Sequence, residues 1–461
     1  MKRSRSATRR KAFAQPVLRF EETADHSLTS FAGLIVFHQL FQTLALRRRL
    51  HACFRHLGGQ AIYGTATVFL QLILHILLGF RELSACEHYR HDPMVKRVLN
   101  LEHIPTAATI SRHLSELDDP AIDKLRATQR DLVMETIEPL GLVRITLDFD
   151  GSVQSTKRFA EGTAVGYNTR KKGQRGYYPL FCTIAQTGQV FDFHHRPGNV
   201  HDSRDARQFM QACIAHIWSL LPNATIEVRI DAAFFSDEIV RFLDKAGIEF
   251  TVSVPFERFP ALKQQIESQR RWKRAGAGFE YFEPRWKPES WSRRFRMIVV
   301  RQKVRERRKA EVQLDLFVPH DERYEFKVIA TNKQIKARYA VRFHEGRGAQ
   351  ETIFGEAKSN GFMGYIPCRR RVANQAYLLA SLFAHNLTRL LQVRADQPAR
   401  RTTPQRTPLW RFETLATVRQ TIVQRAGRLT RPRGMLTLTI AAGDHLRDRI
   451  YQLLSHAPSP R

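Results

Sequence analysis

The sequence predicts an α/β fold, preceded by an all-helical region and followed by a small C-terminal region. Two observations lead to this prediction. Residues 27–138 carry apolar side chains at spacings of three and four, as helices do, whereas residues 142–254 alternate between short β-type runs and amphipathic helical runs. The chain has 461 residues, of which 43% are hydrophobic, so it is long enough for two or three domains with a sizeable core.

Net charge is the most unusual property of the composition. The chain carries 74 Lys and Arg against 44 Asp and Glu, a formal charge of +30, and such a field attracts nucleic acid or an anionic membrane surface. The longest apolar run, residues 66–80, contains Gln71 and His75 and is too short and too polar to span a membrane, so it predicts a buried helix. Five cysteines without CxxC spacing and the absence of a secretory signal predict a cytoplasmic protein.

The N-terminal quarter begins with a basic flexible arm and continues as helices. Residues 1–16 carry six basic residues and no acid. Within the helical part, residues 106–117 follow Pro105 and begin with hydroxyl residues suited to an N-cap, which predicts a short helix. This helix is equally consistent with the reading helix of a helix-turn-helix and with a capped helix that packs against its neighbours.

The central part predicts three strands in a meander and then alternating helices and strands. Residues 142–151 alternate as a strand, and a Thr187-Gly188 turn between the next two strands predicts a hairpin. This order is that of an RNase H-like domain, and the missing phosphate-binding glycine fingerprint argues against a doubly wound nucleotide-binding fold. The remaining predicted elements are strands at residues 177–184, 189–195, 226–231 and 249–254 and helices at 204–221, capped by Asp202 or Ser203, and 237–246.

Between residues 255 and 323 the alternation of helical and strand patterns stops, and glycines, prolines, tryptophans and arginines occur instead. This change predicts a β-rich insertion. Later elements are a strand at residues 324–331, helices at 348–359 and 373–393, a linker near 397–408, a helix near 412–428 and a strand at 435–440. The predicted domains are the basic arm at 1–25, an all-α DNA-binding region at 26–138, an RNase H-like core at 139–254 and 324–396, the insertion at 255–323, and a linker with a small C-terminal region at 397–461.

Acidic residues end two of the predicted strands. Asp148 and Asp150 stand two positions apart and therefore point to the same face, and Asp231 ends the strand at residues 226–231. If these strands are neighbours, Asp150 and Asp231 lie close together, and like charges so close are unfavourable unless a cation neutralises them. A strand-terminal aspartate is also common as a helix cap or turn residue, so either one alone is weak support for a site.

A third acid comes from residues 344–358. On one helix His344, Arg347 and Lys358 would lie within about 40° of Glu351, whereas Glu356 would lie about 140° away. Alone, this pattern is ordinarily that of a solvated row of charges on a surface helix. Together with the two upstream aspartates it predicts three carboxylates from separate elements, which is what a pair of divalent metal ions requires.

These residues carry a family resemblance. The set Asp150-Gly-Ser152, Asp231 and His344-x2-Arg347-x3-Glu351-x6-Lys358 resembles the DDE transposases of bacterial insertion sequences, in the branch with a Tyr-x2-Arg-x3-Glu-x6-Lys signature and a β-strand insertion before the glutamate. Segments 89–93, 196–203 and 367–377 place it nearest the group called insertion sequence thirteen-eighty, over roughly residues 20–450. His344 stands where the signature has tyrosine, and glycines at 346 and 348 interrupt the helix there.

The resemblance implies that Asp150, Asp231 and Glu351 hold two Mg²⁺ or Mn²⁺ ions and catalyse DNA strand cleavage and strand transfer. Asp148 and Glu356 are the alternative ligands. Phosphate contacts close to the scissile bond are implied for Arg347, Lys358 and His344. The family also implies double-stranded DNA partners, namely transposon ends and target DNA, a homodimer in the synaptic complex, no membrane partner, and association with the bacterial nucleoid in the cytoplasm.

Basic segments elsewhere are candidates for holding the DNA backbone. The predicted contacts are Arg170, Lys171, Lys172, Arg175, Arg293 and Arg294. The family suggests that Trp286 or Trp291 stacks on an unpaired base, while burial in a core is the alternative for each tryptophan.

The function predicted from these observations is a transposase that binds the terminal inverted repeats of its own element and moves it by cut-and-paste. One alternative is an RNase H-like nuclease that cuts DNA without strand transfer. A non-enzymatic alternative is a DNA-binding regulator, or a decayed transposase that still binds DNA. The three intact acids argue against decay.

Overall fold

A mixed sheet lies at the centre of the computed structural model, which describes residues 27–58, 62–166, 171–275, 278–303, 324–401 and 408–455. Its strand order is β10-β11-β12-β13-β9-β8-β2-β6-β7, in which the pairs β2–β8 and β8–β9 are parallel and the other pairs antiparallel. The strands are β2 (Arg144–Gly151), β6 (Leu180–Ile184), β7 (Gln189–His194), β8 (Thr225–Ile230), β9 (Glu249–Ser253), β10 (Lys273–Arg274), β11 (Phe279–Phe282), β12 (Arg296–Lys303) and β13 (Tyr324–Thr331).

The mixed α/β fold predicted from the sequence is confirmed. β2, β6 and β7 form the antiparallel meander, and β8 and β9 then join on the other side of β2, which is the order expected for an RNase H-like domain. One predicted strand, residues 177–184, is broken in two. Its first part is β5 (Arg175–Tyr177), which leaves the central sheet and pairs with β3 (Gln154–Thr156) and β4 (Ala164–Val165).

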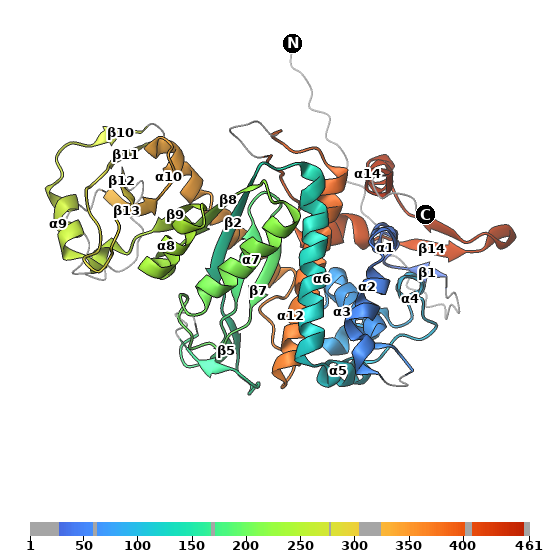
Figure 1. Ribbon diagram of the computed structural model, residues 1–461. Helices are drawn as coiled ribbons and strands as arrows, with labels where there is room; N and C mark the ends of the chain where they lie inside the picture. The colour runs from blue at the N-terminus through green and yellow to red at the C-terminus, as the bar shows by residue number, and fades with distance from the viewer. Residues whose placement is uncertain are drawn as a thin grey trace, which may run out of the picture.

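Helices cover the sheet and join it to the N-terminal region (Figure 1). Side chains of α7 (Ala206–Leu220) and α8 (Asp237–Lys245) belong to one core cluster with the central strands. The long helix α12 (Arg371–Ala395) is buried along almost its whole length and contacts α3, α6 and β7. The N-terminal helices therefore share a continuous core with α12, and the domain boundaries inferred from the sequence stay a prediction.

The N-terminal region is helical apart from the two-residue strand β1 (Leu28–Thr29). The helix predicted after Pro105 is present, and Thr106 Oγ1 accepts a hydrogen bond from the backbone N–H of Thr109. The elements are α1 (Leu34–Thr43), α2 (Leu46–Phe54), η1 (Arg55–Leu57), α3 (Thr65–Leu78), η2 (Leu83–Tyr89), α4 (Pro93–Leu99), α5 (Ala107–Glu116), α6 (Asp119–Ile137) and η3 (Glu138–Leu140). Within the described ranges no single helix is long and apolar enough to cross a membrane, although α3 and η2, bent by 79°, pass that test as a pair.

The predicted insertion contributes strands to the same sheet. After β9 the chain forms η5 (Phe256–Arg258) and α9 (Pro260–Ser268), and β10, β11 and β12 then extend the sheet through β13. Residues 304–323 lie outside the described residues. β13 pairs with β9 and leads into α10 (Ala337–Glu345) and α11 (Gly348–Ser359), so the insertion returns the chain to the edge of the central strands.

The C-terminal region differs from the prediction. The helix expected at residues 412–428 is shorter, because α13 (Leu415–Val418) and η6 (Arg419–Val423) end before β14 (Gly427–Thr430). β14 pairs with β1 and with β15 (Thr437–Ile440), and η7 (Pro432–Gly434) lies between the paired strands. A final helix, α14 (Asp444–Ser455), was not predicted, and the basic arm at 1–25 and linker residues 402–407 lie outside the described residues.

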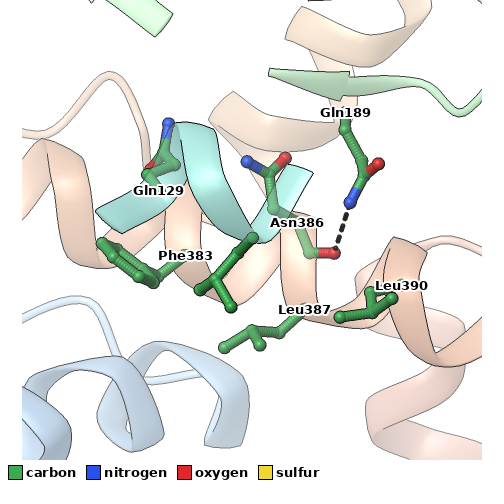
Figure 2. A pocket seen from close by; sticks show the side chains of 7 residues that line it. Gln129, Gln189, Phe383, Asn386, Leu387 and Leu390 are labelled. Carbon is green, nitrogen blue, oxygen red and sulfur yellow. Dashed lines mark hydrogen bonds between the residues drawn. The ribbon is translucent and has the colours of Figure 1, made fainter. Parts of the chain in front are cut away.

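A cavity of only about 10 Å³ lies where α6, β7 and α12 meet (Figure 2). Gln189 Nε2 donates to the backbone carbonyl of Asn386 across this junction, at 3.2 Å. The side-chain oxygens of Gln129 and Gln189 are buried without a protein partner. The cavity is at the lower limit for one water molecule, so it is a packing feature of the joint between the helical region and the sheet.

Candidate active site

The register of β2 and β8 brings two aspartates together. These strands are parallel, with Phe149 opposite Ile230, so the next residues, Asp150 and Asp231, leave the same end of the sheet side by side. Asp231 Oδ1 accepts a hydrogen bond of 2.9 Å from the backbone N–H of Ala233, which holds its carboxylate at the strand end.

The proximity of these carboxylates changes the acidity of the first one. Burial, which is the larger cause, and the negative charge of Asp231 together raise the pKa of Asp150 from 3.8 to about 7, although the Arg347 guanidinium acts in the opposite direction. The side chain of Asp150 is 18% exposed. Two carboxylates in this position repel each other, and an added cation would relieve that repulsion.

Asp148, the alternative first ligand, is engaged elsewhere. Its two carboxylate oxygens accept hydrogen bonds of 2.6 Å each from Arg229 Nε and Nη2, and its side chain is 1% exposed. Arg229 also donates to the carbonyl of Phe343 at the end of α10. The Asp148–Arg229 pair is therefore a buried structural ion pair beneath the aspartates at the strand ends.

Helix α11 brings Glu351 to the same end of the sheet. Gln350 Nε2 donates to the backbone carbonyl of Asp148 at 3.0 Å and fixes the first turn of α11 over β2. Arg347, at the start of that helix, lies 3.4 Å from Asp150 Oδ2 and 3.9 Å from Glu351 Oε1. Glu351 itself is 71% exposed, so Arg347 bridges a buried acid and a solvent-facing one.

The other acid of α11 faces the interior. Glu356 is 7% exposed, pairs with Arg389 of α12 and accepts a hydrogen bond from the backbone N–H of Leu415. Its environment is thus that of a buried ion pair. Lys358, in the last turn of α11, is half-buried.

His344 does not share the stripe considered in the sequence. The segment forms two helices, because α10 ends at Glu345 and α11 begins at Gly348. His344 Nε2 bonds to Ser253 Oγ at 2.8 Å and Nδ1 to Thr251 Oγ1 at 3.0 Å, both on β9. Burial lowers the pKa of His344 to about 3, so the ring is neutral and both its nitrogens are occupied. The predicted phosphate contact of His344 is therefore corrected to a structural role.

A third aspartate faces the site and was missed as a site residue. Asp202 was expected to cap the helix at 204–221, but the N-cap position of α7 is Asp205, and Asp202 Oδ2 instead accepts a hydrogen bond of 3.0 Å from Tyr178 Oη. Burial raises the pKa of Asp202, and Asp231 contributes to the increase. Arg196, within the 196–203 motif, donates to the carbonyls of His201 and Asp202 and shapes this loop. The segment 196–203, which is part of the family resemblance, was the sequence signal that could have identified Asp202 as a site residue.

Gly151 makes room for this arrangement. A Cβ atom at this position would lie 2.3 Å from Tyr178 Cζ and 2.5 Å from Asp202 Oδ1. The glycine that follows Asp150 therefore permits the tyrosine ring and the loop carboxylate to approach the strand end.

Among the predicted DNA contacts, the structure describes all but Arg170, which lies outside the described residues. Lys171 and Lys172 are exposed beside the small sheet of β3, β4 and β5. Arg175 on β5 is exposed but donates to Thr163, and its guanidinium lies 5.6 Å from the ring of Phe159.

The predicted contacts of the insertion divide into exposed arginines and buried tryptophans. Arg293 pairs with Asp244, and both Arg293 and Arg294 are exposed. Trp286 is 8% exposed against Phe259, and Trp291 is 5% exposed against Phe235. Base stacking by either tryptophan is therefore corrected to core packing, because neither ring presents a free face.

The carboxylates of Asp150, Asp231 and Glu351 suit a hard divalent cation as ligands, although the three do not lie close together in this structure. Within the described ranges no group of three or more His, Cys, Asp or Glu side chains lies close enough to hold a metal ion. Asp150 and Asp231 are carboxylate neighbours, which Mg²⁺ and Mn²⁺ favour as ligands. Glu351 is separated from them by the Arg347 guanidinium.

Among solved structures, a piggyBac transposase synaptic complex with hairpin DNA is 12% identical with a TM-score of 0.38, over 77% of this chain and 75% of that one. A Mos1 transposase paired-end complex with the left transposon end is 9% identical with a TM-score of 0.18, over 42% of this chain and 59% of that one. No curated protein matches the chain. A family model described as transposase DDE domain group 1 matches residues 19–458, and the chain belongs to this transposase family.

Proposed function

We propose that this chain is the transposase of a bacterial insertion sequence of the group thirteen-eighty, and that it excises its element by cut-and-paste. In this proposal it binds the terminal inverted repeats, cleaves DNA strands and joins the freed ends to target DNA. The observation that carries the proposal is the pair Asp150 and Asp231, side by side at the ends of parallel strands with a raised pKa on Asp150. Buried carboxylates in mutual repulsion are typical of catalytic sites.

Asp150, Asp231 and Glu351 would hold two Mg²⁺ or Mn²⁺ ions. When bound, such ions activate a water or DNA hydroxyl for in-line attack at phosphorus and neutralise the leaving oxygen. Asp150 and Asp231 supply hard oxygen donors from rigid strand ends, whereas Glu351 supplies its donor from the exposed face of α11. The alternative acids Asp148 and Glu356 are less suitable, because each neutralises a buried arginine.

Arg347 has two roles in this proposal. In the structure its guanidinium neutralises part of the charge of Asp150 and Glu351. With that charge neutralised by bound cations, Arg347 would be free to donate to a DNA phosphate near the scissile bond, with planar donors suited to phosphate oxygens. Lys358 lies two turns further along α11, about 20° from Glu351 around the helix axis, and would contact the next phosphates on the same side.

The wider surface would hold the duplex through charge. The exposed Lys171, Lys172 and Arg294, together with Arg293 and the net charge of +30, support binding to the phosphate backbone that weakens steeply with salt. A homodimer that brings two transposon ends together, and association with the nucleoid, belong to the same proposal.

The test uses a supercoiled donor plasmid that carries the flanking repeats, incubated with the full chain and Mg²⁺. The Asp231→Asn and Glu351→Gln variants should lose excision by a factor of at least about 10³, because each would replace one carboxylate oxygen by an amide nitrogen and remove the negative charge that binds a cation. The matched control is Glu238→Gln, a 62% exposed acid on α8 that should leave excision unchanged. Equal excision by all four proteins would overturn the assignment.

The products separate the proposed function from its alternatives. Joined target DNA indicates a transposase. Cut donor without joined product indicates a nuclease of the same fold. Binding without metal-dependent cutting indicates a DNA-binding regulator.

A further inference from the structure

A β-hairpin near the C-terminus projects from the body of the molecule (Figure 1). Its strands β14 and β15 pair from Gly427 opposite Ile440 to Thr430 opposite Thr437. Every residue of the connecting segment, 431–436, is exposed. The hairpin belongs to no part of the carboxylate site, and none of the DNA contacts predicted from the sequence lies on it.

The base of the hairpin is fixed to the core. Leu28 of β1 pairs with Arg428, and the backbone N–H of Ala32 donates to the carbonyl of Arg425 at 2.9 Å. A Cβ atom at Gly427 would lie 2.6 Å from the Cβ of Ala32, so glycine is what allows this close approach. The partly buried Leu429 and Leu438 also pack against the core cluster. The base of the hairpin is thus held against the core, whereas the tip is exposed to solvent.

All charged residues in and around the hairpin are basic. Residues 414–443 contain five arginines and no aspartate or glutamate. Two of these arginines, Arg431 and Arg433, are exposed at the tip, and their side chains make no hydrogen bond or ion pair with any other described residue. By contrast Arg449, on the following helix, pairs with Asp396. Unpaired arginines on a projecting ribbon stabilise nothing within the chain, and phosphates are the ligands that complement them.

The shape of the tip also fits a duplex. A two-stranded ribbon is narrow enough to enter the major groove of DNA or to lie along its edge. The tip turns sharply, with positive φ at Arg433 (53°) and Gly434 (82°), and this turn presents Met435 with 70% of its surface exposed. An exposed apolar side chain next to two arginines can contact base edges while the guanidiniums hold the backbone.

We propose that the β14–β15 hairpin is a DNA-docking arm, in which Arg431 and Arg433 contact phosphates of a bound duplex and Met435 enters a groove. The proposal rests on the proposed function only in that the protein acts on double-stranded DNA. It assigns a contact separate from the catalytic carboxylates and from the basic segments near β5 and β12.

The first experiment measures binding of the full chain to a fluorescent duplex carrying the element's end, without metal, across 50–300 mM KCl. Arg431→Gln with Arg433→Gln should weaken binding about tenfold at 150 mM and make the slope of log affinity against log salt shallower by about 1.8, since two phosphate contacts are lost. The control is Arg90→Gln with Arg447→Gln, which removes the same charge from two other exposed arginines and should change affinity less than about twofold. An unchanged slope for the tip variant would overturn the proposal.

A second measurement locates the contact. Met435→Cys carrying an iron chelate should cut the duplex within a few base pairs of one position, whereas the native chain treated with the same reagent should not. If the tip variant alters only self-association in sedimentation, the partner of the hairpin is a second copy, which β15 as an edge strand could pair with, and the proposal is wrong.

Failure of this inference is distinguishable from failure of the proposed function. An inactive excision reaction combined with a shallower salt slope for the tip variant leaves the docking arm in place and removes the transposition assignment. Normal excision combined with an unchanged salt slope for the tip variant leaves the transposition assignment in place and removes the docking arm.

Discussion

Replacing Asp150 by asparagine should stabilise the metal-free protein at neutral pH while it removes the proposed catalysis. The folded protein holds this carboxyl with a pKa raised from 3.8 to about 7, because it is buried beside Asp231. Ionising it in the folded state is therefore costly, whereas asparagine fills nearly the same space without a charge. The substitution removes a repulsion and keeps the packing.

The size of the effect follows from the shift in pKa. A raised pKa in the folded state contributes stability that is fully present below the unfolded value and is lost as pH rises through the folded value. A shift from 3.8 to about 7 corresponds to about 4 kcal/mol, and the side chain is only 18% exposed, so solvent screening reduces this figure little. The advantage of Asp150→Asn should be about 0.5 kcal/mol at pH 4, about 1.7 kcal/mol at pH 5 and about 4 kcal/mol at pH 8.

The assay is the free energy of unfolding from urea titrations in EDTA at several pH values between 4 and 8. Glu351→Gln is the matched control, because this acid is 71% exposed and its loss should change stability by less than about 0.5 kcal/mol. Excess Mg²⁺ should stabilise the native protein more than the Asp150→Asn variant and so narrow the gap between them. A gap that stayed constant or closed as pH rose would refute the electrostatic reasoning.

Three further predictions concern buried charge. Asp148→Asn should destabilise the fold by about 3–5 kcal/mol, seen as a lower urea midpoint, because it leaves Arg229 buried without its partner; a midpoint within error of the native value would contradict this. Glu356→Gln should cost a similar amount, about 3–5 kcal/mol, through Arg389, yet the variant that remains folded should still excise DNA, and loss of cleavage at full folding would instead make Glu356 a ligand. Melting temperature should fall as pH drops from 6.5 to 4.5, because several histidines are buried with pKa values lowered to about 3, so the unfolded chain takes up protons that the folded chain does not; a rising melting temperature would argue against their burial. These histidines are His195, His344 and His385.

Much of the fold could be predicted because its signals are local. The strand at β7 and the helix α11 have distinct apolar periodicity and clear end signals, and the observed bounds agree closely with the expected ones. The C-terminal elements could not be predicted as well. β14 is four residues long and pairs with β1, almost 400 residues earlier in the chain, so no local pattern specifies it.

The site was predictable where it rests on strand ends. Two aspartates that end strands are visible in the sequence, and the register of β2 and β8 places them together. Asp202 was missed because an acid before a helix is ordinarily a cap, and only the position of Tyr178 shows that it faces the site. For Trp286 and Trp291 the sequence left open whether the ring is buried or stacks on a base. Their burial depends on residues distant in sequence, such as Phe235 and Phe259, which no local pattern reveals.

The break between α10 and α11 explains why the position of Glu351 could not be predicted by treating residues 344–358 as one helix. A Cβ atom at Gly346 would lie 2.1 Å from Arg229 Nη1, so the glycine lets the chain pass against the arginine that pairs with Asp148. Arg229 in turn donates to Phe343, and Gln350 donates to Asp148, so both sides of the break are tied to β2 and β8. The direction of α11, and with it the position of Glu351, therefore depends on the buried Asp148–Arg229 pair. An acid in a buried ion pair thereby sets where a proposed metal ligand lies, and periodicity along one helix cannot reveal such a dependence.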